Sequence, residues 1–322
     1  MFAPSLSHET LWVILEMIEN IFKEIRDLCN HPWKREVLFQ DKVKWNKLWA
    51  SMDVLEDSQI AIDDYLSLME FDSNRKGYLY VYGILQALNL QQDSLRNLNI
   101  SLFGEDINFK EKHPELYKIR ENRNNSIGHP TDRMNGTSFH HISRHSIKKE
   151  GFTMLSYFPK TGEESKFEDI NILSCIETQE KLLIKILNKT MEELKSDFDE
   201  HKNKFKDNKL SNLIHPSIDY QFSKLYENIH RDYELVEINF ETIFDTYVKI
   251  KDGIIARYHN LSALSGVELT IEMLDYLFSR VKQDLIENKI DDQLELRVFV
   301  DALKMNFGEL KSMIKEIDDE FK

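Results

Sequence analysis

The stretch LWVILEMIENIFKEIRDL, residues 11–28, decides the fold class of this chain. Its apolar residues recur every three or four positions, and this spacing places them on one face of an α-helix. The Asn-His-Pro sequence at residues 30–32 should end the helix, because a proline cannot continue it. We therefore predict a long first helix whose buried face consists of Leu11, Ile14, Leu15, Ile18, Ile21, Phe22, Ile25 and Leu28.

The remaining chain also favours a mainly α protein. It contains only 10 glycines and 6 prolines in 322 residues, a composition typical of helices with short connections. A fourth helix is predicted to begin at Pro114, and Gly128 and Pro130 should close it. Apolar periodicity predicts the other helices at residues 41–69, 77–98, 167–194, 220–250, 271–286 and 294–317.

One segment departs from the helical pattern. Residues 138–147 and 152–158 are predicted to be extended, and the Lys-Lys-Glu-Gly sequence at 148–151 suits a hairpin turn. We therefore expect a helical domain over residues 1–195 that carries a β-hairpin at about 137–158. A second helical domain should follow at 196–322. The charge-rich segment 195–209 is either the boundary between them or a solvated helix that continues through it.

The charge of the chain is unevenly distributed. The net charge is −14, which argues against general affinity for nucleic acid. Residues 110–149 nevertheless hold nine Lys and Arg against four Asp and Glu, so a polyanion could approach this window. The same window contains five of the eleven histidines, namely His113, His129, His140, His141 and His145.

Cysteine content and hydropathy bear on the compartment. Cys29 and Cys175 lie too far apart in the sequence to form a disulfide framework or a four-cysteine metal site. The apolar run at residues 11–18 is too short to span a bilayer and lacks the features of a signal peptide. We expect a cytoplasmic protein without a membrane partner.

The sequence RNNSIGH, residues 123–129, is the main candidate for a functional motif. A guanidinium can hold a phosphate through paired hydrogen bonds, and an imidazole can move protons near neutral pH. Two other pairs, Arg26 with His31 and Arg133 with His140, have similar spacing. Arg123 is preferred because the polar Asn124 follows it, at the end of the predicted fourth helix and inside the basic window.

This motif, preceded by three predicted helices and followed by Pro130, resembles the Arg-polar-x3-5-His motif of HEPN domains (higher eukaryotes and prokaryotes nucleotide-binding). These are all-helical modules, and many are metal-independent ribonucleases. The resemblance covers roughly residues 7–130. It implies that Arg123 binds the scissile phosphate, that Asn124 orients the site, and that His129 acts as general base or acid.

The implied reaction is an attack by a ribose 2′-OH on its neighbouring phosphate, which needs no metal or cofactor. RNA is therefore the implied substrate, and a homodimer is the implied assembly. A toxin or defence effector with a protein inhibitor or regulatory partner would fit. Thr131 stands where toxins neutralised by nucleotidyltransferase partners often carry a tyrosine, so that antitoxin arrangement is not implied. Lys118, Arg120 and Arg133 are predicted as further substrate contacts.

Other interpretations of these residues stay open. Arg123, Asn124 and His129 near a helix end could simply satisfy a turn, and Arg120 could be salt-bridged. The chain would then be a catalytically inactive helical adaptor. His141 and His145 would lie about 13 Å apart on a strand, too far to bind one ion directly, so we expect no metal there. The histidine-rich segment would instead be an RNA-facing ribbon or an ordinary exposed strand.

Overall fold

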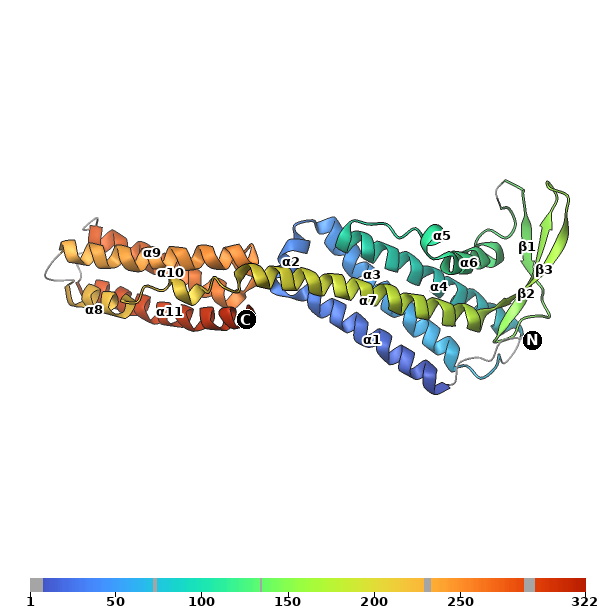
Figure 1. Ribbon diagram of the computed structural model, residues 1–322, viewed down its shortest axis with the longest axis horizontal. Helices are drawn as coiled ribbons and strands as arrows, with labels where there is room; N and C mark the ends of the chain where they lie inside the picture. Colours follow the sequence, from blue (N-terminus) through green and yellow to red (C-terminus); the bar gives the residue numbers. More distant parts are fainter. Residues whose placement is uncertain (1–7, 72–73, 134, 229–232, 287–292) are drawn as a thin grey trace. The chain divides into compact units, whose positions relative to one another are not determined.

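The computed structural model describes residues 8–71, 74–133, 135–228, 233–286 and 293–322 (Figure 1). The chain forms two compact units. Unit 1 comprises Met1–Leu28 and Asp41–Leu194, and unit 2 comprises Cys29–Gln40 and Lys195–Lys322. Residues 29–40 thus group with the C-terminal part of the chain and not with the residues on either side of them.

Unit 1 is built on long helices that carry a small sheet at one end (Figure 1). Its core consists of apolar side chains from one face of each helix, and Ile18, Ile25 and Leu55 have no exposed surface. The prediction of a long first helix with one buried face is confirmed for Ile18, Ile21, Phe22 and Ile25. The helices with residues in this unit are α1 (His8–Asn30), α3 (Lys42–Ser67), α4 (Asn74–Phe103), α5 (Phe109–Lys112), α6 (Pro114–Arg123) and α7 (Ile172–Phe205).

Local chemistry explains where α3 begins and how α1 is tied to it. The Asp41 carboxylate accepts hydrogen bonds from the backbone N–H groups of Val43 and Lys44, which leaves two fewer unpaired donors at the helix start. Arg26 of α1 donates to Glu56 at 2.6 Å and to Asp53 at 2.7 Å, both on α3. These contacts fix one face of α1 against α3.

The sheet has three antiparallel strands in the order β1 (Phe139–Ile142), β2 (Gly151–Phe158) and β3 (Glu163–Asn171). The expected β insertion is present, but the helix predicted from residue 167 begins only at Ile172, and β3 was not predicted. The reason is that β3 is largely solvated. Only Ile170 in this strand is buried, so the alternation of apolar and polar residues is too weak to mark it.

Gly151 begins β2, and the pairing of β2 with β3 requires a glycine at this position. Its φ of +157° lies in a region that side-chain-bearing residues rarely adopt, and a Cβ there would meet the Ile170 carbonyl oxygen at 1.9 Å. Lys148 and Gly151 also exchange backbone hydrogen bonds, which close the turn before β2. The glycine that the sequence suggested as the end of a turn therefore has a steric function in the sheet.

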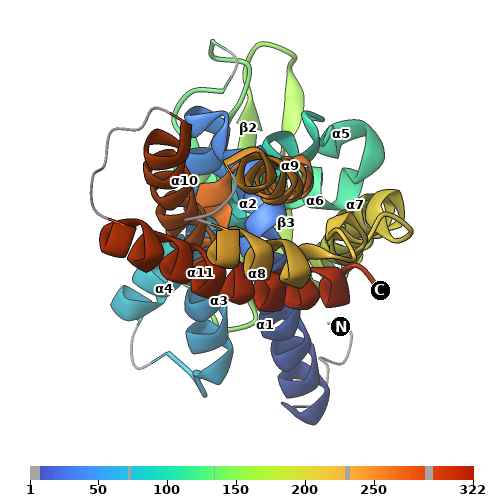
Figure 2. The ribbon, with the colours of Figure 1, turned by 90° about the vertical axis from the view of Figure 1, so that its left-hand side faces the viewer.

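Unit 2 is a bundle of helices (Figures 1 and 2). Its buried side chains form an aromatic-rich core. Tyr247, Phe240, Phe278 and Phe307 are among its largest fully buried side chains. Helix α7 runs on to Phe205, so residues 195–205 of the charge-rich segment are helical and residues 206–209 are not. The other helices of this unit are α2 (Pro32–Phe39), α8 (Ile218–Asn228), α9 (Tyr233–Tyr258), α10 (Ser265–Ile286) and α11 (Gln293–Glu320).

Within the described ranges, none of these helices combines the length and the apolar character that crossing a bilayer would demand.

Candidate functional site

The motif begins where α6 changes its geometry. Pro114 starts α6, and the helix passes after Arg123 into a π-helical turn, η1 (Asn124–Gly128). The turn closes when the His129 backbone N–H donates to the Asn124 carbonyl oxygen at 2.8 Å, five residues earlier. Single π-helical turns occur frequently at functional sites. Here the wide turn separates Arg123, at the end of α6, from His129, which follows the turn.

The Arg123 guanidinium is held by neutral amides. Its Nη2 and Nε donate to the Gln86 side-chain oxygen on α4 at 2.7 and 3.2 Å, and its Nη1 donates to Asn124 Oδ1 at 3.1 Å. No carboxylate among the described residues forms an ion pair with it. Arg123 is half-buried, so its orientation is fixed while its positive charge stays uncompensated.

Gly128 allows this guanidinium to lie against the turn. A Cβ at Gly128 would sit 2.7 Å from Arg123 Nη1, well inside van der Waals contact. The cation therefore lies beside the residue that immediately precedes His129. The His129 side chain is exposed and makes no hydrogen bond, ion pair or ring contact within the part of the chain that the structure describes. The imidazole is therefore accessible from solvent.

The three further substrate contacts predicted from the sequence differ from Arg123, because each of them forms an ion pair with a carboxylate. Arg120 pairs with Asp93 at 2.5 Å, Lys118 pairs with Glu168 at 2.9 Å, and Arg133 pairs with Glu121 at 2.5 Å. A paired cation attracts a phosphate less strongly than an unpaired one, because its charge is already balanced. Arg133 is nevertheless linked to the motif, since Glu121 also accepts from the Asn124 amide at 3.4 Å.

The histidine-rich segment divides into different environments. His140 is buried, and its two ring nitrogens lie 2.7 Å from Ser156 Oγ and 2.9 Å from Ser138 Oγ. Burial, reinforced by Arg133, lowers the pKa of His140. His141 is exposed and stacks on Tyr157, with ring centroids 5.6 Å apart. The described residues include no group of three or more His, Cys, Asp or Glu placed to hold a metal ion.

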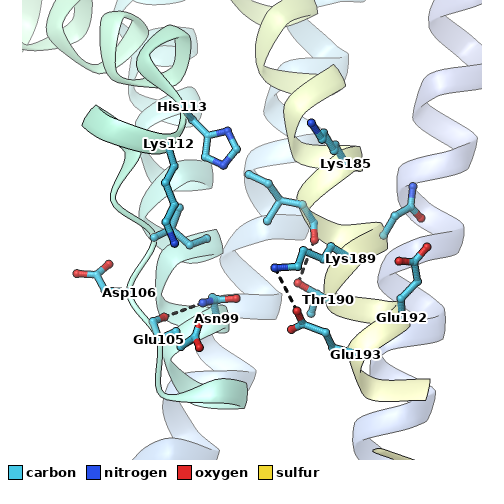
Figure 3. Close-up of a pocket in the computed structure, with 13 residues that line it drawn as sticks. Asn99, Glu105, Asp106, Lys112, His113, Lys185, Lys189, Thr190, Glu192 and Glu193 are labelled. Carbon is cyan, nitrogen blue, oxygen red and sulfur yellow. Dashed lines mark hydrogen bonds and ion pairs between the residues drawn. The ribbon is translucent and has the colours of Figure 1, made fainter. Parts of the chain in front are cut away.

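A separate cavity of about 490 Å³ lies elsewhere in unit 1, between α7 and the segment that joins α4 to α6 (Figure 3). Lys112 and His113 lie on one wall, and Lys185 and Lys189 lie on the other. Burial and the charge of Lys185 lower the pKa of His113. The carboxylates that share this cavity, Glu105, Asp106, Glu192 and Glu193, offset the lysines, so it is a poorer site for a polyanion.

Sequence reasoning missed two residues of the Arg123 site. Gln86 lies 37 positions before Arg123, and no local pattern connects them. Gly128 was visible inside the motif but was interpreted only as a helix terminator. In general a guanidinium such as that of Arg123 can bind a phosphate, and an imidazole such as that of His129 can transfer protons. Comparison of the chain with models of protein families, with curated proteins and with solved structures found no match.

Proposed function

We propose that this protein is a metal-independent endoribonuclease of the HEPN type, with its site at the end of α6. The observation that carries the proposal is the state of Arg123. Its guanidinium is oriented by two amide oxygens, keeps its full charge, and lies beside the residue that precedes the exposed His129. A fixed, uncompensated cation beside Gly128, together with an accessible imidazole on the following residue, suits a phosphodiester substrate.

In the proposed reaction Arg123 binds the non-bridging oxygens of one phosphate, where negative charge increases in the transition state. Asn124 holds the guanidinium in place. His129 takes the proton from the ribose 2′-OH. The bond from O2′ to phosphorus forms as the bond from phosphorus to O5′ breaks, and solvent donates a proton to O5′. The products are a 2′,3′-cyclic phosphate and a 5′-hydroxyl, and DNA is spared because it has no 2′-OH.

The biological setting is part of the same proposal. A toxin or defence effector that acts as a cytoplasmic homodimer would suit such an activity, with unit 2 available for partner binding or control. The pairing of Arg120, Lys118 and Arg133 with carboxylates favours the second candidate, an inactive helical adaptor, because it removes three cations from phosphate binding.

The test is cleavage of single-stranded RNA by the full-length protein in EDTA. We expect Arg123→Ala and His129→Ala to lower the rate by on the order of 100-fold or more while circular dichroism shows an intact fold. Arg96→Ala and His215→Ala are matched controls, because Arg96 is an exposed arginine paired with Asp106 and His215 is an exposed histidine of unit 2. Equal cleavage by all five proteins would favour the adaptor.

A further inference from the structure

A cleft of about 600 Å³ opens directly beside the π-helical turn. One wall comes from α4, a second from Ser126, Pro130 and Thr131, and a third from the sheet. The lining residues Ser126 and Pro130 flank His129 in the sequence, so the cleft lies beside the segment that carries this histidine. The Pro130 carbonyl accepts from the His140 backbone N–H at 2.7 Å, which fixes β1 against the segment that carries His129.

Exposed aromatic side chains line this cleft. Tyr82 and Phe167 keep 46% and 72% of their surface in contact with solvent, although burial would be favourable for both rings. Tyr78 supports Tyr82 from one turn earlier on α4, with centroids 6.1 Å apart and rings nearly perpendicular. His141, Leu155 and Phe167 are directly opposite one another on the three strands, so they share one face of the sheet.

The charge of the cleft suits a polyanion. Arg144 lines it, is exposed, and has no carboxylate partner among the residues that the structure describes. No Asp or Glu is among the described residues of the lining. This distinguishes the cleft from the cavity of Figure 3, which holds four carboxylates. The whole chain has a net charge of −14, whereas the described lining of this cleft contains no acidic side chain.

We propose that this cleft binds unpaired nucleotides of single-stranded RNA that adjoin the phosphate held by Arg123. Two bases stack on Tyr82 and Phe167, and a backbone phosphate contacts Arg144. Stacking of this kind requires bases that are not paired in a duplex, and every base offers a face for it. The inference rests on the proposed nuclease function for its choice of RNA, and it adds the substrate class and the residues that hold it.

Binding can be measured apart from cleavage with a fluorescein-labelled 12-nucleotide RNA whose riboses are all 2′-O-methylated. That oligonucleotide has no free 2′-OH and cannot undergo the proposed reaction. We expect Tyr82→Ala and Phe167→Ala to raise Kd about 5- to 150-fold in fluorescence anisotropy of the full-length protein. Arg144→Ala should weaken binding and reduce the slope of log Kd against log salt by about one.

Matched controls are Tyr220→Ala and Arg96→Ala, which remove an exposed aromatic ring and an exposed guanidinium elsewhere. We expect both to bind as the unaltered protein does, and the same oligonucleotide in a duplex to bind more weakly. Equal Kd values for the three cleft variants and the controls would overturn the cleft assignment, even if Arg123 and His129 prove essential for cleavage. Loss of binding in the cleft variants without any RNA cleavage would retain the cleft as an RNA site and refute the nuclease.

Discussion

Arg120 and Glu180 lie at opposite ends of one continuous chain of side-chain hydrogen bonds. At one end Arg120 Nε donates to Gln92 Oε1 at 3.3 Å. At the other end Gln59 Nε2 donates to Glu180 Oε1 at 3.4 Å. Between these ends Gln92 donates to Gln179, Gln179 donates to Gln91, and Gln91 donates to Gln59. Each of these bonds runs from Nε2 to Oε1 and is 2.7 to 2.8 Å long. The chain consists of four buried glutamines, Gln92, Gln179, Gln91 and Gln59.

All five bonds of this glutamine chain point the same way, from the cation to the carboxyl. Aligned amides polarise one another in a medium of low dielectric constant, and this strengthens each bond. The glutamine chain connects α3, α4, α6 and α7, the helices that position Gln86 and Arg123. These directional bonds therefore favour one arrangement of the helices around the candidate site. Apolar contacts alone would allow the helices to slide along one another.

The first prediction concerns the pH dependence of stability at Glu180. Burial raises the pKa of this carboxyl to about 7, and its Oε2 has no hydrogen-bond partner. Between pH 4.5 and 7 the folded protein then binds more protons at this group than the unfolded chain does. Stability should fall as pH rises through this window, by roughly 3 kcal/mol. Burial also raises the pKa of Asp63, which acts in the same direction.

Glu180→Gln removes the ionisable group and keeps an acceptor for Gln59. Urea unfolding at pH 5 and pH 8 should show that the variant has lost most of this slope and is more stable than the unaltered protein at pH 8. Glu193→Gln is the matched control, since Glu193 forms an ion pair with Lys189 on the same helix and does not contribute to the raised pKa of Glu180. A pH profile unchanged by Glu180→Gln would contradict the assignment.

A second prediction tests whether Arg123 must keep its charge. Gln86→Glu replaces the amide oxygen that accepts from Arg123 Nη2 at 2.7 Å with a carboxylate of nearly the same shape. The new ion pair should lower RNA cleavage by on the order of 100-fold without lowering the melting temperature. Gln283→Glu introduces the same change opposite Arg280 in unit 2 and should leave cleavage unchanged. Full activity of Gln86→Glu would show that phosphate binding does not depend on this charge.

Gly128→Ala tests the close approach of the guanidinium to the turn. The added methyl group would lie 2.7 Å from Arg123 Nη1, so the cation must shift. A displacement near 1 Å is expected to cost about 100-fold in kcat, with thermal stability changed by less than about 1 kcal/mol. Gly83→Ala on α4 has nothing within 4 Å of the new atom and serves as the control. Wild-type kcat in Gly128→Ala would argue against Arg123 as the phosphate ligand.

The fourth prediction concerns the ion pair between Lys34 and Asp197 in unit 2. Lys34 Nζ lies 2.6 Å from Asp197 Oδ2, and the lysine side chain is only 8% exposed while the aspartate is 43% exposed. Asp197→Asn leaves a buried ammonium without its counter-charge and should cost roughly 1–3 kcal/mol in urea unfolding. Lys34→Met should cost less, because it removes the charge that needs compensation. Equal costs for the two variants would contradict this account.

Residue spacing predicted the helices of unit 1 well and the sheet only in part. The buried face of α1 follows from apolar positions that recur at helical spacing, and Pro32 marks its end. Strand β3 escaped prediction because eight of its nine residues are not buried, so pairing with β2 determines its structure. The helix expected at 220–250 corresponds to parts of α8 and α9, and residues 229–232 within it lie outside the described chain.

The candidate site was predictable only where its residues are adjacent in the sequence. Arg123, Asn124 and His129 form one short motif, and the structure keeps Arg123 and Asn124 in contact. The carboxylates that pair with Arg120 and Lys118 lie 27 and 50 residues away. No local spacing reveals such partners, so a count of basic residues does not show which cations are already paired with carboxylates.

The assignment of residues 29–40 to unit 2 has a consequence for synthesis of the protein on the ribosome. Helix α2 emerges early, yet Asp197, the partner of Lys34, is added 163 residues later. The ring of Trp33 stacks on His201 with centroids 4.0 Å apart, and this contact likewise cannot form until His201 has been synthesised. At ordinary translation speeds this delay is on the order of 8–30 s. During that interval α2 lacks both of these contacts, so its indole and its ammonium stay in water until residues 197 and 201 have been added.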